Sequence, residues 1–179
     1  MTKLAVKHFP VANPDPLILY VLVRADLSTM GRGKALAQAG HVGSLFARDH
    51  FIEPLRNGEV VDPLAWEWYD SECTNMTNPL GFGVKLTLDV PNLTTMEAIS
   101  DTASALGFKS AILTDPSYPV IVPNEIAGRM DRSRFTLPSS PVGPNDTVCY
   151  FREDTMAYIF GHKSKLEVLL SRFKLVPND

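Results

Sequence analysis

The sequence has few cysteines, little net charge and no long apolar run, and each shortage excludes a class of protein. Its 179 residues contain two cysteines, Cys73 and Cys149, which are too few for a disulfide framework and typical of a reduced, cytoplasmic protein. The 17 Lys and Arg against 20 Asp and Glu give a net charge of −3, which argues against nucleic-acid binding through bulk charge but leaves open a local basic patch. The longest apolar run, Leu17 to Val23, is far shorter than the roughly 20 residues that span a bilayer, so we expect no membrane partner.

Several common functional signatures are also missing. Residues 1–16 contain no apolar segment of the kind that a secretory signal needs. There is no Cys-x-x-Cys, and the four histidines show no metal-ligand spacing, so we expect no metal site and no cofactor. A Gly-x-Ser-x-Gly nucleophile elbow is absent as well. We therefore expect neither a secretory signal, nor a metal or cofactor site, nor a serine nucleophile of the elbow type.

The composition that remains is that of a folded α/β protein. The chain is 45% hydrophobic, which excludes global disorder, and its length suits one domain. Pro10, Pro14 and Pro16 predict an irregular arm over residues 1–16, which leaves residues 17–179 as a single domain.

Strands and helices are expected to alternate along this domain. The expected strands are 17–23, 82–90, 111–114, 147–152 and 155–160, and the expected helices are 31–48 (or 34–48), 96–106 and 166–173. We expect Thr94 or Thr95 to cap the second helix and Gly107 to end it. The alternation favours an α/β sandwich.

The first helix begins with the most informative loop, Met30-Gly31-Arg32-Gly33-Lys34. Glycines let the backbone approach a ligand closely, and a helix N-terminus attracts anions, so the loop predicts a phosphate or oxyanion site. It is not a Walker P-loop, because Ala35 stands where Ser or Thr would bind magnesium. An ordinary strand-to-helix turn is the alternative interpretation.

Two further patterns indicate where a site would lie. Lys34, Gln38 and His41 follow one another at helical spacing and form a polar stripe beside an apolar one. Asp115 follows the expected 111–114 strand, at the strand end where α/β sheets place their sites. We therefore expect the Lys34 ammonium and the Asp115 carboxylate to meet in one solvent-reachable hollow. The alternatives are a solvated lysine and a turn-forming aspartate.

The same helix carries a resemblance to a known family. Val23-Arg24-Ala25-Asp26-Leu27, then Met30-Gly31-Arg32-Gly33-Lys34, then Ala37-Gln38 and His41 resemble the type 2 peptidyl-tRNA hydrolases. Looser similarity continues in the same order to about residue 176. The resemblance implies a three-layer α/β/α sandwich around a small mixed, mainly parallel β-sheet. It also implies cleavage of the ester between a peptide and its tRNA by activated water.

Candidate catalytic residues follow from the match. Lys34 and Gln38 match the family's functional lysine and its partner one turn later, and Asp115 matches the aspartate after the third strand. Pro119 stands where the family has a threonine. Asp115 would orient or deprotonate the water, Lys34 would stabilise the oxyanion, and Gln38 would position water or substrate.

A later part of the family pattern is interrupted. About 26 residues, placed at roughly 127–152, look inserted before the last strand. Of the family's closing Thr-x-Thr, only Thr155 survives, with Thr147 as a rival match.

The partner that the resemblance implies is peptidyl-tRNA. Between Arg24 and Arg48 the only acidic residue is Asp26, so this segment predicts a locally basic face for phosphate contact. The expected tRNA- or phosphate-binding residues are Arg24, Gly31, Arg32, Gly33 and Arg48. The sequence leaves open a homodimer.

Two other functions stay open. A non-catalytic RNA- or protein-binding module could retain the fold without turnover, which Pro119 and the insertion favour. An amide or ester hydrolase with a substrate other than tRNA would suit the acidic charge balance.

Overall fold

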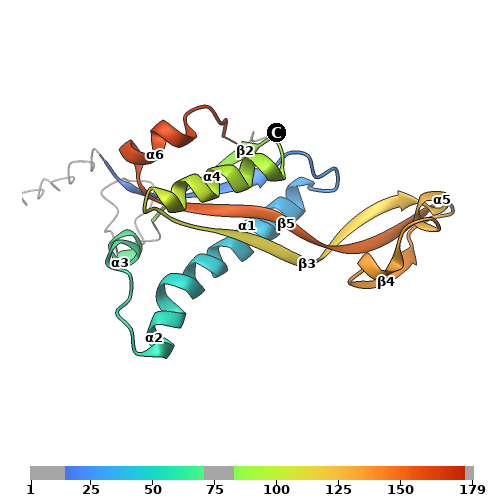
Figure 1. Ribbon diagram of the computed structural model, residues 1–179, viewed down its shortest axis with the longest axis horizontal. Coiled ribbons are helices and arrows are strands. Elements are labelled where there is room, and N and C mark those ends of the chain that lie inside the picture. The colour runs from blue at the N-terminus through green and yellow to red at the C-terminus, as the bar shows by residue number, and fades with distance from the viewer. Residues whose placement is uncertain (1–14, 71–82, 176–179) are drawn as a thin grey trace, which may run out of the picture.

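The computed structural model describes residues 15–70 and 83–175 (Figure 1). In chain order the elements are β1 (Leu17–Arg24), α1 (Arg32–Ala47), the π-helix η1 (Arg48–Ile52), α2 (Glu53–Asn57), α3 (Pro63–Asp70), β2 (Val84–Val90), α4 (Leu93–Ala105), β3 (Lys109–Pro123), α5 (Asn124–Ala127), the 3-10 helix η2 (Arg132–Arg134), β4 (Leu137–Pro141), β5 (Asp146–His162) and α6 (Lys163–Leu170). Most of the irregular arm predicted over residues 1–16 lies outside the described residues, as do Cys73 and Phe82.

The sheet is mixed, with the strand order β2-β1-β5-β3, and β4 pairs with β5 beside this path. Only the β1–β2 pairing is parallel among the described strands, whereas β5 pairs antiparallel with β1, β3 and β4. The mixed α/β architecture is therefore confirmed, but the expectation of a mainly parallel sheet is wrong. The reason is β5, which runs against all three of its neighbours.

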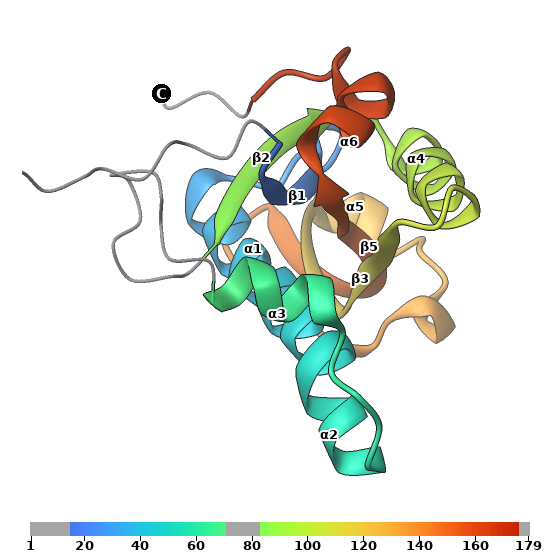
Figure 2. The ribbon, with the colours of Figure 1, turned by 90° about the vertical axis from the view of Figure 1, so that its left-hand side faces the viewer.

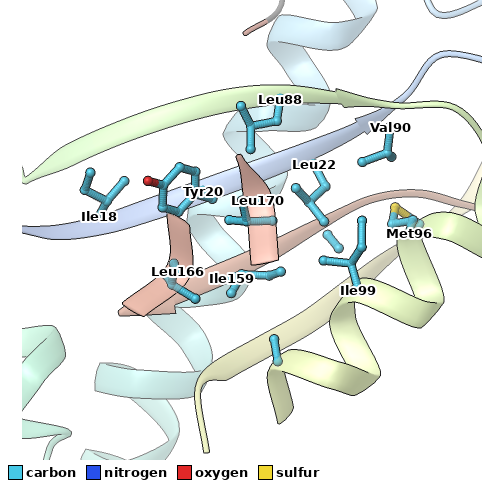
Figure 3. Packing of buried hydrophobic residues seen from close by; sticks show 12 residues of the cluster. Ile18, Tyr20, Leu22, Leu88, Val90, Met96, Ile99, Ile159, Leu166 and Leu170 are labelled. Atoms are coloured by element: carbon cyan, nitrogen blue, oxygen red, sulfur yellow. The ribbon is translucent and has the colours of Figure 1, made fainter. Parts of the chain in front are cut away.

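Helices cover both faces of the sheet and complete the three layers. Alternate residues of β1 point to opposite faces, so Ile18, Tyr20 and Leu22 pack toward α4 and α6 (Figure 3). On the other face, Leu19 and Val21 pack toward α1 and α3. Figure 2 shows the two groups of helices on opposite sides of the strands. Because every residue of β1 is buried, its sequence is continuously apolar up to Arg24.

The first helix forms as its sequence predicts. Val42 and Phe46 are buried, and Ala35 and Ala39 pack at the edge of the same cluster. Gly31 is the N-cap residue, and the helix passes at Arg48 into one turn of π-helix. The apolar stripe fixes the rotation of α1, and it thereby turns the neighbouring polar stripe toward β3.

One local expectation, the N-cap residue of α4, is corrected. Asn92, not Thr94 or Thr95, caps α4, because its side chain accepts a hydrogen bond from the Thr95 N–H at 2.9 Å. Gly107 ends this region as expected, with a left-handed φ of 83°. Within α3, Trp68 is buried whereas Trp66 is 54% exposed.

The segment after Asp115 continues as a strand, whereas the expected strand ended at residue 114. β3 continues to Pro123 through Pro116 and Pro119, paired along its length with β5. Prolines are tolerated there because β3 is an edge strand whose outer side needs no ladder hydrogen bonds. Likewise, the two strands expected at 147–152 and 155–160 are one strand, β5.

The distal halves of β3 and β5 leave the helical layers and, with β4, form a projecting arm (Figure 1). This arm contains most of the segment predicted as an insertion, residues 127–152. Its base is the pairing of Tyr118 with Phe151 and of Pro119 with Tyr150. The arm therefore starts three residues beyond Asp115.

Candidate active site

Gln38 of α1 joins the two strands that carry the predicted site residues. Its amide Nε2 donates to Asp115 Oδ2 at 2.6 Å, and its Oε1 accepts from the Thr155 hydroxyl at 3.1 Å. The ionised carboxylate only accepts hydrogen bonds, so the amide orientation of Gln38 is fixed. Gln38 is 6% exposed and Thr155 is fully buried, so the bond between them is shielded from water, whereas Asp115 is only partly buried.

Two irregularities in the β3–β5 pairing create this meeting point. Leu113 pairs with Met156 and Thr114 with Asp154, which leaves Thr155 as an extra residue on β5. A second shift follows between Asp115 and Tyr118 on β3. Bulges of this kind re-aim side chains, and here they bracket the two residues that bond to Gln38. The Asp115 Oδ1 additionally accepts the Ser117 N–H at 2.8 Å, which fixes the carboxylate.

Lys34 lies one helical turn before Gln38 and beside the base of the arm. Its ammonium donates to the Pro119 carbonyl at 3.4 Å and stands 4.3 Å from the centre of the Tyr118 ring. Burial lowers the pKa of the Lys34 ammonium below its ordinary value, while the charge of Asp115 acts in the opposite direction. The charge of the Lys34 ammonium thus interacts with that of Asp115.

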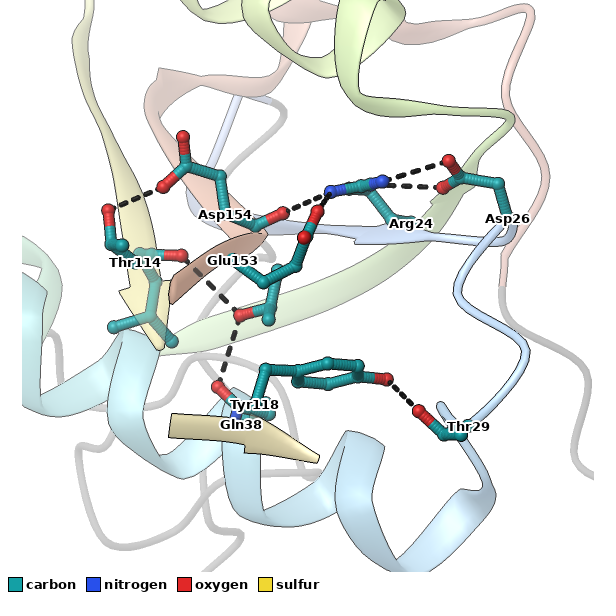
Figure 4. A network of polar contacts seen from close by, with 10 residues as sticks. Arg24, Asp26, Thr29, Gln38, Thr114, Tyr118, Glu153 and Asp154 are labelled. Carbon is teal, nitrogen blue, oxygen red and sulfur yellow. Dashed lines mark hydrogen bonds and ion pairs between the residues drawn. The ribbon is translucent and has the colours of Figure 1, made fainter. Parts of the chain in front are cut away.

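A hydroxyl pair secures this corner (Figure 4). The Thr29 hydroxyl lies 3.0 Å from the Pro119 carbonyl and 2.9 Å from the Tyr118 hydroxyl. A carbonyl only accepts, and Thr29 has one proton to donate, so we infer that the Tyr118 hydroxyl donates to Thr29. Burial raises the pKa of the Tyr118 phenol and keeps that proton in place. The loop before α1 is thereby fixed to the base of the arm.

A hollow of about 520 Å³ opens beside Asp115. Its walls are α1 and the start of η1 on one side and β3 on the other. The lining residues are Gln38, His41, Ser44, Leu45, Arg48 and residues 113–116. Asp115 and Gln38 line it together. The expectation that Lys34 shares this hollow with Asp115 is wrong, because the Lys34 ammonium turns toward the Pro119 carbonyl and the Tyr118 ring.

The residues predicted to bind phosphate have different surroundings. Gly31, Arg32 and Gly33 are exposed at the start of α1. The Arg48 side chain is 56% exposed and lines the hollow. Arg24 is different, because it is only 6% exposed.

The Arg24 guanidinium is occupied within the protein. It pairs with Asp26 at 2.9 Å and with Glu153, and it donates to the Asp154 carbonyl at 2.7 Å (Figure 4). The hydrogen bond with Asp26 is the main reason that the pKa of Arg24 rises. We therefore leave Arg24 out of the phosphate contacts and assign it to the joint between β1 and β5.

The structure adds Tyr118, which the sequence patterns did not select, and gives a position to His41, which the predicted polar stripe contained. Tyr118 contacts Lys34 only because β3 continues as a strand, which the three prolines concealed. His41 belongs to the predicted polar stripe, and the structure shows that it lines the same hollow as Asp115. Spacing along α1 was the available signal for His41, and the sequence carried none for Tyr118.

Within residues 15–70 and 83–175, no cluster of three or more His, Cys, Asp or Glu side chains could hold a metal ion. No described helix is long and apolar enough to cross a bilayer. At Gln38 the structure brings together a carboxylate held by two hydrogen bonds, a lysine ammonium one helical turn away and an adjoining hollow. Groups of these kinds can orient water and stabilise an oxyanion.

Comparison with known families identifies the family of the chain. The model of the family described as peptidyl-tRNA hydrolase PTH2 matches residues 17–127, and the chain belongs to this family. The match includes Lys34, Gln38 and Asp115 and ends at the start of the segment predicted as an insertion. A search of curated proteins found no match.

Proposed function

We propose that this member of the peptidyl-tRNA hydrolase PTH2 family hydrolyses the ester that joins a peptide to its tRNA. The observation that carries the proposal is the Gln38 amide bonded to both Asp115 and Thr155 at the edge of an open hollow. An ester hydrolase needs a positioned base and a cation for the oxyanion, and Asp115 and Lys34 supply these groups.

The proposed reaction begins with Asp115. Its two oxygens each accept one hydrogen bond from the protein, and a carboxylate has about four acceptor sites, so it can also accept a proton from water. The water oxygen attacks the ester carbonyl carbon, and the carbonyl oxygen gains negative charge. The carbon–oxygen bond to the ribose then breaks, and the ribose oxygen takes the proton. The products are a tRNA with a free hydroxyl and a peptide carboxylic acid, which releases its proton to solvent and becomes a carboxylate.

The other residues act around this step. Lys34 would turn from the Pro119 carbonyl toward the developing oxyanion, which requires rotation of a flexible side chain only. Gln38 holds the Asp115 carboxylate, and Thr155 fixes Gln38, so Thr155 is a positioning residue. Arg32 and Arg48 are the arginines proposed to contact tRNA phosphates, and the glycines Gly31 and Gly33 allow close approach.

The test is release of an N-acetylated amino acid from charged tRNA. We expect hydrolysis by the wild-type chain and a loss of about a hundred- to a thousand-fold in Lys34→Ala and Asp115→Asn. Leu36→Ala is the matched control, because Leu36 lies on the same helix and is 67% exposed. Full activity in both site variants would show that neither Lys34 nor Asp115 acts in the reaction.

A second candidate function is a binding module without turnover. Pro119 favours this candidate for two reasons. It stands where the family has a hydroxyl side chain, and its carbonyl accepts a hydrogen bond from the Lys34 ammonium. Salt-sensitive binding of tRNA by a wild-type chain that releases no amino acid would support this candidate over the hydrolase.

A further inference from the structure

The projecting arm stands beside the candidate site, and most of it lies beyond the family match, which ends at residue 127. Its base contacts the start of α1, because the Thr29 hydroxyl and the Lys34 ammonium lie 3.0 and 3.4 Å from the Pro119 carbonyl. From there the arm extends away from the helical layers (Figure 1). A substrate that is larger than the hollow at Asp115 and passes Lys34 would therefore meet the arm.

The arm carries a local excess of positive charge. Residues 128–145 include three arginines, Arg129, Arg132 and Arg134, and a single acidic residue, Asp131. All three arginines are exposed. The Asp131 carboxylate accepts the Ser133 N–H at 2.9 Å and caps η2, so it has a role within the backbone of the arm. Three positive charges against one negative charge leave this segment at +2, in a chain whose net charge is −3.

The arginines of the arm differ from those of the body in their partners. Three arginines of the body form salt bridges with acidic side chains: Arg24 with Asp26 and Glu153, Arg48 with Asp49, and Arg56 with Glu53. In the part of the chain that the structure describes, no salt bridge involves an arginine of the arm. Their charge is therefore available to an external anion, and several such groups on one short segment suit a polyanion.

A hollow of about 400 Å³ opens on the arm where η2 passes into β4. It is lined by Arg132, Phe135, Thr136, Leu137, Pro138 and Ser139. The Phe135 ring packs edge-on against Phe151, with 5.3 Å between the ring centres, and is thereby fixed. Unpaired nucleotides bind where an aromatic ring lies beside an arginine, since the ring stacks on a base and the guanidinium holds a phosphate. The lining therefore favours RNA over an acidic peptide, whose carboxylates need only the positive charge.

This hollow lies within reach of an RNA strand that leaves the candidate site. In the arm, β5 is the middle strand, because Tyr150 pairs with Pro119 of β3 and with Leu137 of β4. Neighbouring strands are about 4.8 Å apart, so Leu137 at the hollow is about 10 Å from Pro119. The Pro119 carbonyl is the group that the Lys34 ammonium contacts. One nucleic-acid strand can therefore pass Lys34 and reach the hollow on the arm.

We propose that the arm is a second RNA-binding surface, which holds the tRNA at a distance from the ester. Arg132 and Arg134 donate hydrogen bonds to phosphates of the strand that leads away from the reaction, and Phe135 packs against a nucleotide in the hollow. The identity of the RNA as substrate tRNA rests on the proposed hydrolase function. The volume of the hollow lies within the usual range of about 300–1,000 Å³ for small-ligand sites, which suits one nucleotide.

The test is equilibrium binding of deacylated tRNA, measured over a series of salt concentrations. We expect the double variant Arg132→Gln/Arg134→Gln to raise the Kd by about tenfold or more at physiological salt. The plot of log affinity against log salt should become shallower by about two, one for each lost phosphate contact. The matched control is Arg56→Gln/Arg172→Gln, which removes the same charge from two exposed arginines, one on α2 and one just after α6. We expect the control to leave the slope unchanged, because these arginines lie away from the arm.

Each outcome decides the assignment. Unchanged binding in the arm variant overturns it and leaves the arm to a partner other than RNA. Equal weakening in both double variants overturns it as well, because net charge and not a contact on the arm would then explain the loss.

The hydrolase and the arm are tested separately. If the chain hydrolyses N-acetylated, charged tRNA, the arm variant should raise KM by a factor similar to the rise in Kd. A wild-type chain that binds tRNA but releases no amino acid refutes the hydrolase, and the comparison of the two double variants still decides whether the arm binds RNA.

Discussion

The amide of Gln38 lies 2.6 Å from the carboxylate of Asp115, although the two residues are 77 positions apart in the chain. This bond connects the polar stripe of α1 to the edge strand β3, and the buried Thr155 hydroxyl completes it from β5. The contact gives Asp115 a fixed orientation without neutralising its charge, since the amide is neutral.

Removing the Gln38 amide should lower the rate of the chemical step. Gln38→Ala leaves an oxygen of Asp115 and the Thr155 hydroxyl without their partner, so we expect kcat on charged tRNA to fall by about ten- to a hundredfold. Gln38→Glu should act differently, because two adjacent carboxylates share a proton and the pKa of the pair rises. The acidic limb of the pH–rate profile should then move to higher pH. An unaltered profile in Gln38→Glu would show that Asp115 does not act as a base.

The basic limb of the same profile should report Lys34. Burial lowers the pKa of this ammonium from its ordinary 10.5, so activity should decline, as pH rises, at a pH below 10.5. Lys34→Arg should recover part of the activity lost in Lys34→Ala and shift this decline upward, because guanidinium stays protonated. The measurement is initial rates corrected for spontaneous ester hydrolysis. A decline at the same pH in Lys34→Arg would assign the limb to another group.

Tyr118 should act through its ring more than through its hydroxyl. Tyr118→Leu removes the ring that faces the Lys34 ammonium at 4.3 Å, and we expect kcat to fall by about tenfold with little change in KM. Tyr118→Phe keeps the ring and loses only the bond to Thr29, so most of the activity should return. Equal losses in both variants would show that the hydroxyl bond, and not the ring, positions Lys34.

Arg24 should matter for stability. Arg24→Met leaves Asp26 and Glu153 without their shared partner, at an expected cost on the order of 2 kcal/mol in the free energy of unfolding, between the values for exposed and buried pairs. Arg56→Met, in the exposed pair with Glu53, is the matched control and should change little. Urea denaturation measures both. Equal stability of the two variants would contradict the assignment of Arg24 to the contact between β1 and β5.

Local spacing predicted much of the first helix and its site. The apolar and polar stripes of α1 follow from helical periodicity, and they place Gln38 and Lys34 toward β3. The fold class and its three layers also followed from the alternation of elements and from the family resemblance.

Long-range pairing decided what the sequence could not predict. Asp115 was expected at the end of a strand, but it lies within β3, because the pairing with β5 carries the strand through three prolines. The bulge that turns Thr155 toward Gln38 depends on how two distant segments align. The sequence predicted a phosphate-binding role for Arg24, because its partner Glu153 lies 129 residues away in the chain.

The most direct test of the central claim is a double-mutant comparison of Lys34 and Asp115 in single-turnover hydrolysis of N-acetylated, charged tRNA. If the two groups act on one transition state, Lys34→Ala and Asp115→Asn should each lose about a hundredfold or more, and the double variant should lose far less than the product of the two. Losses that multiply would show two independent roles, and near wild-type rates in both single variants would contradict a site built from these residues.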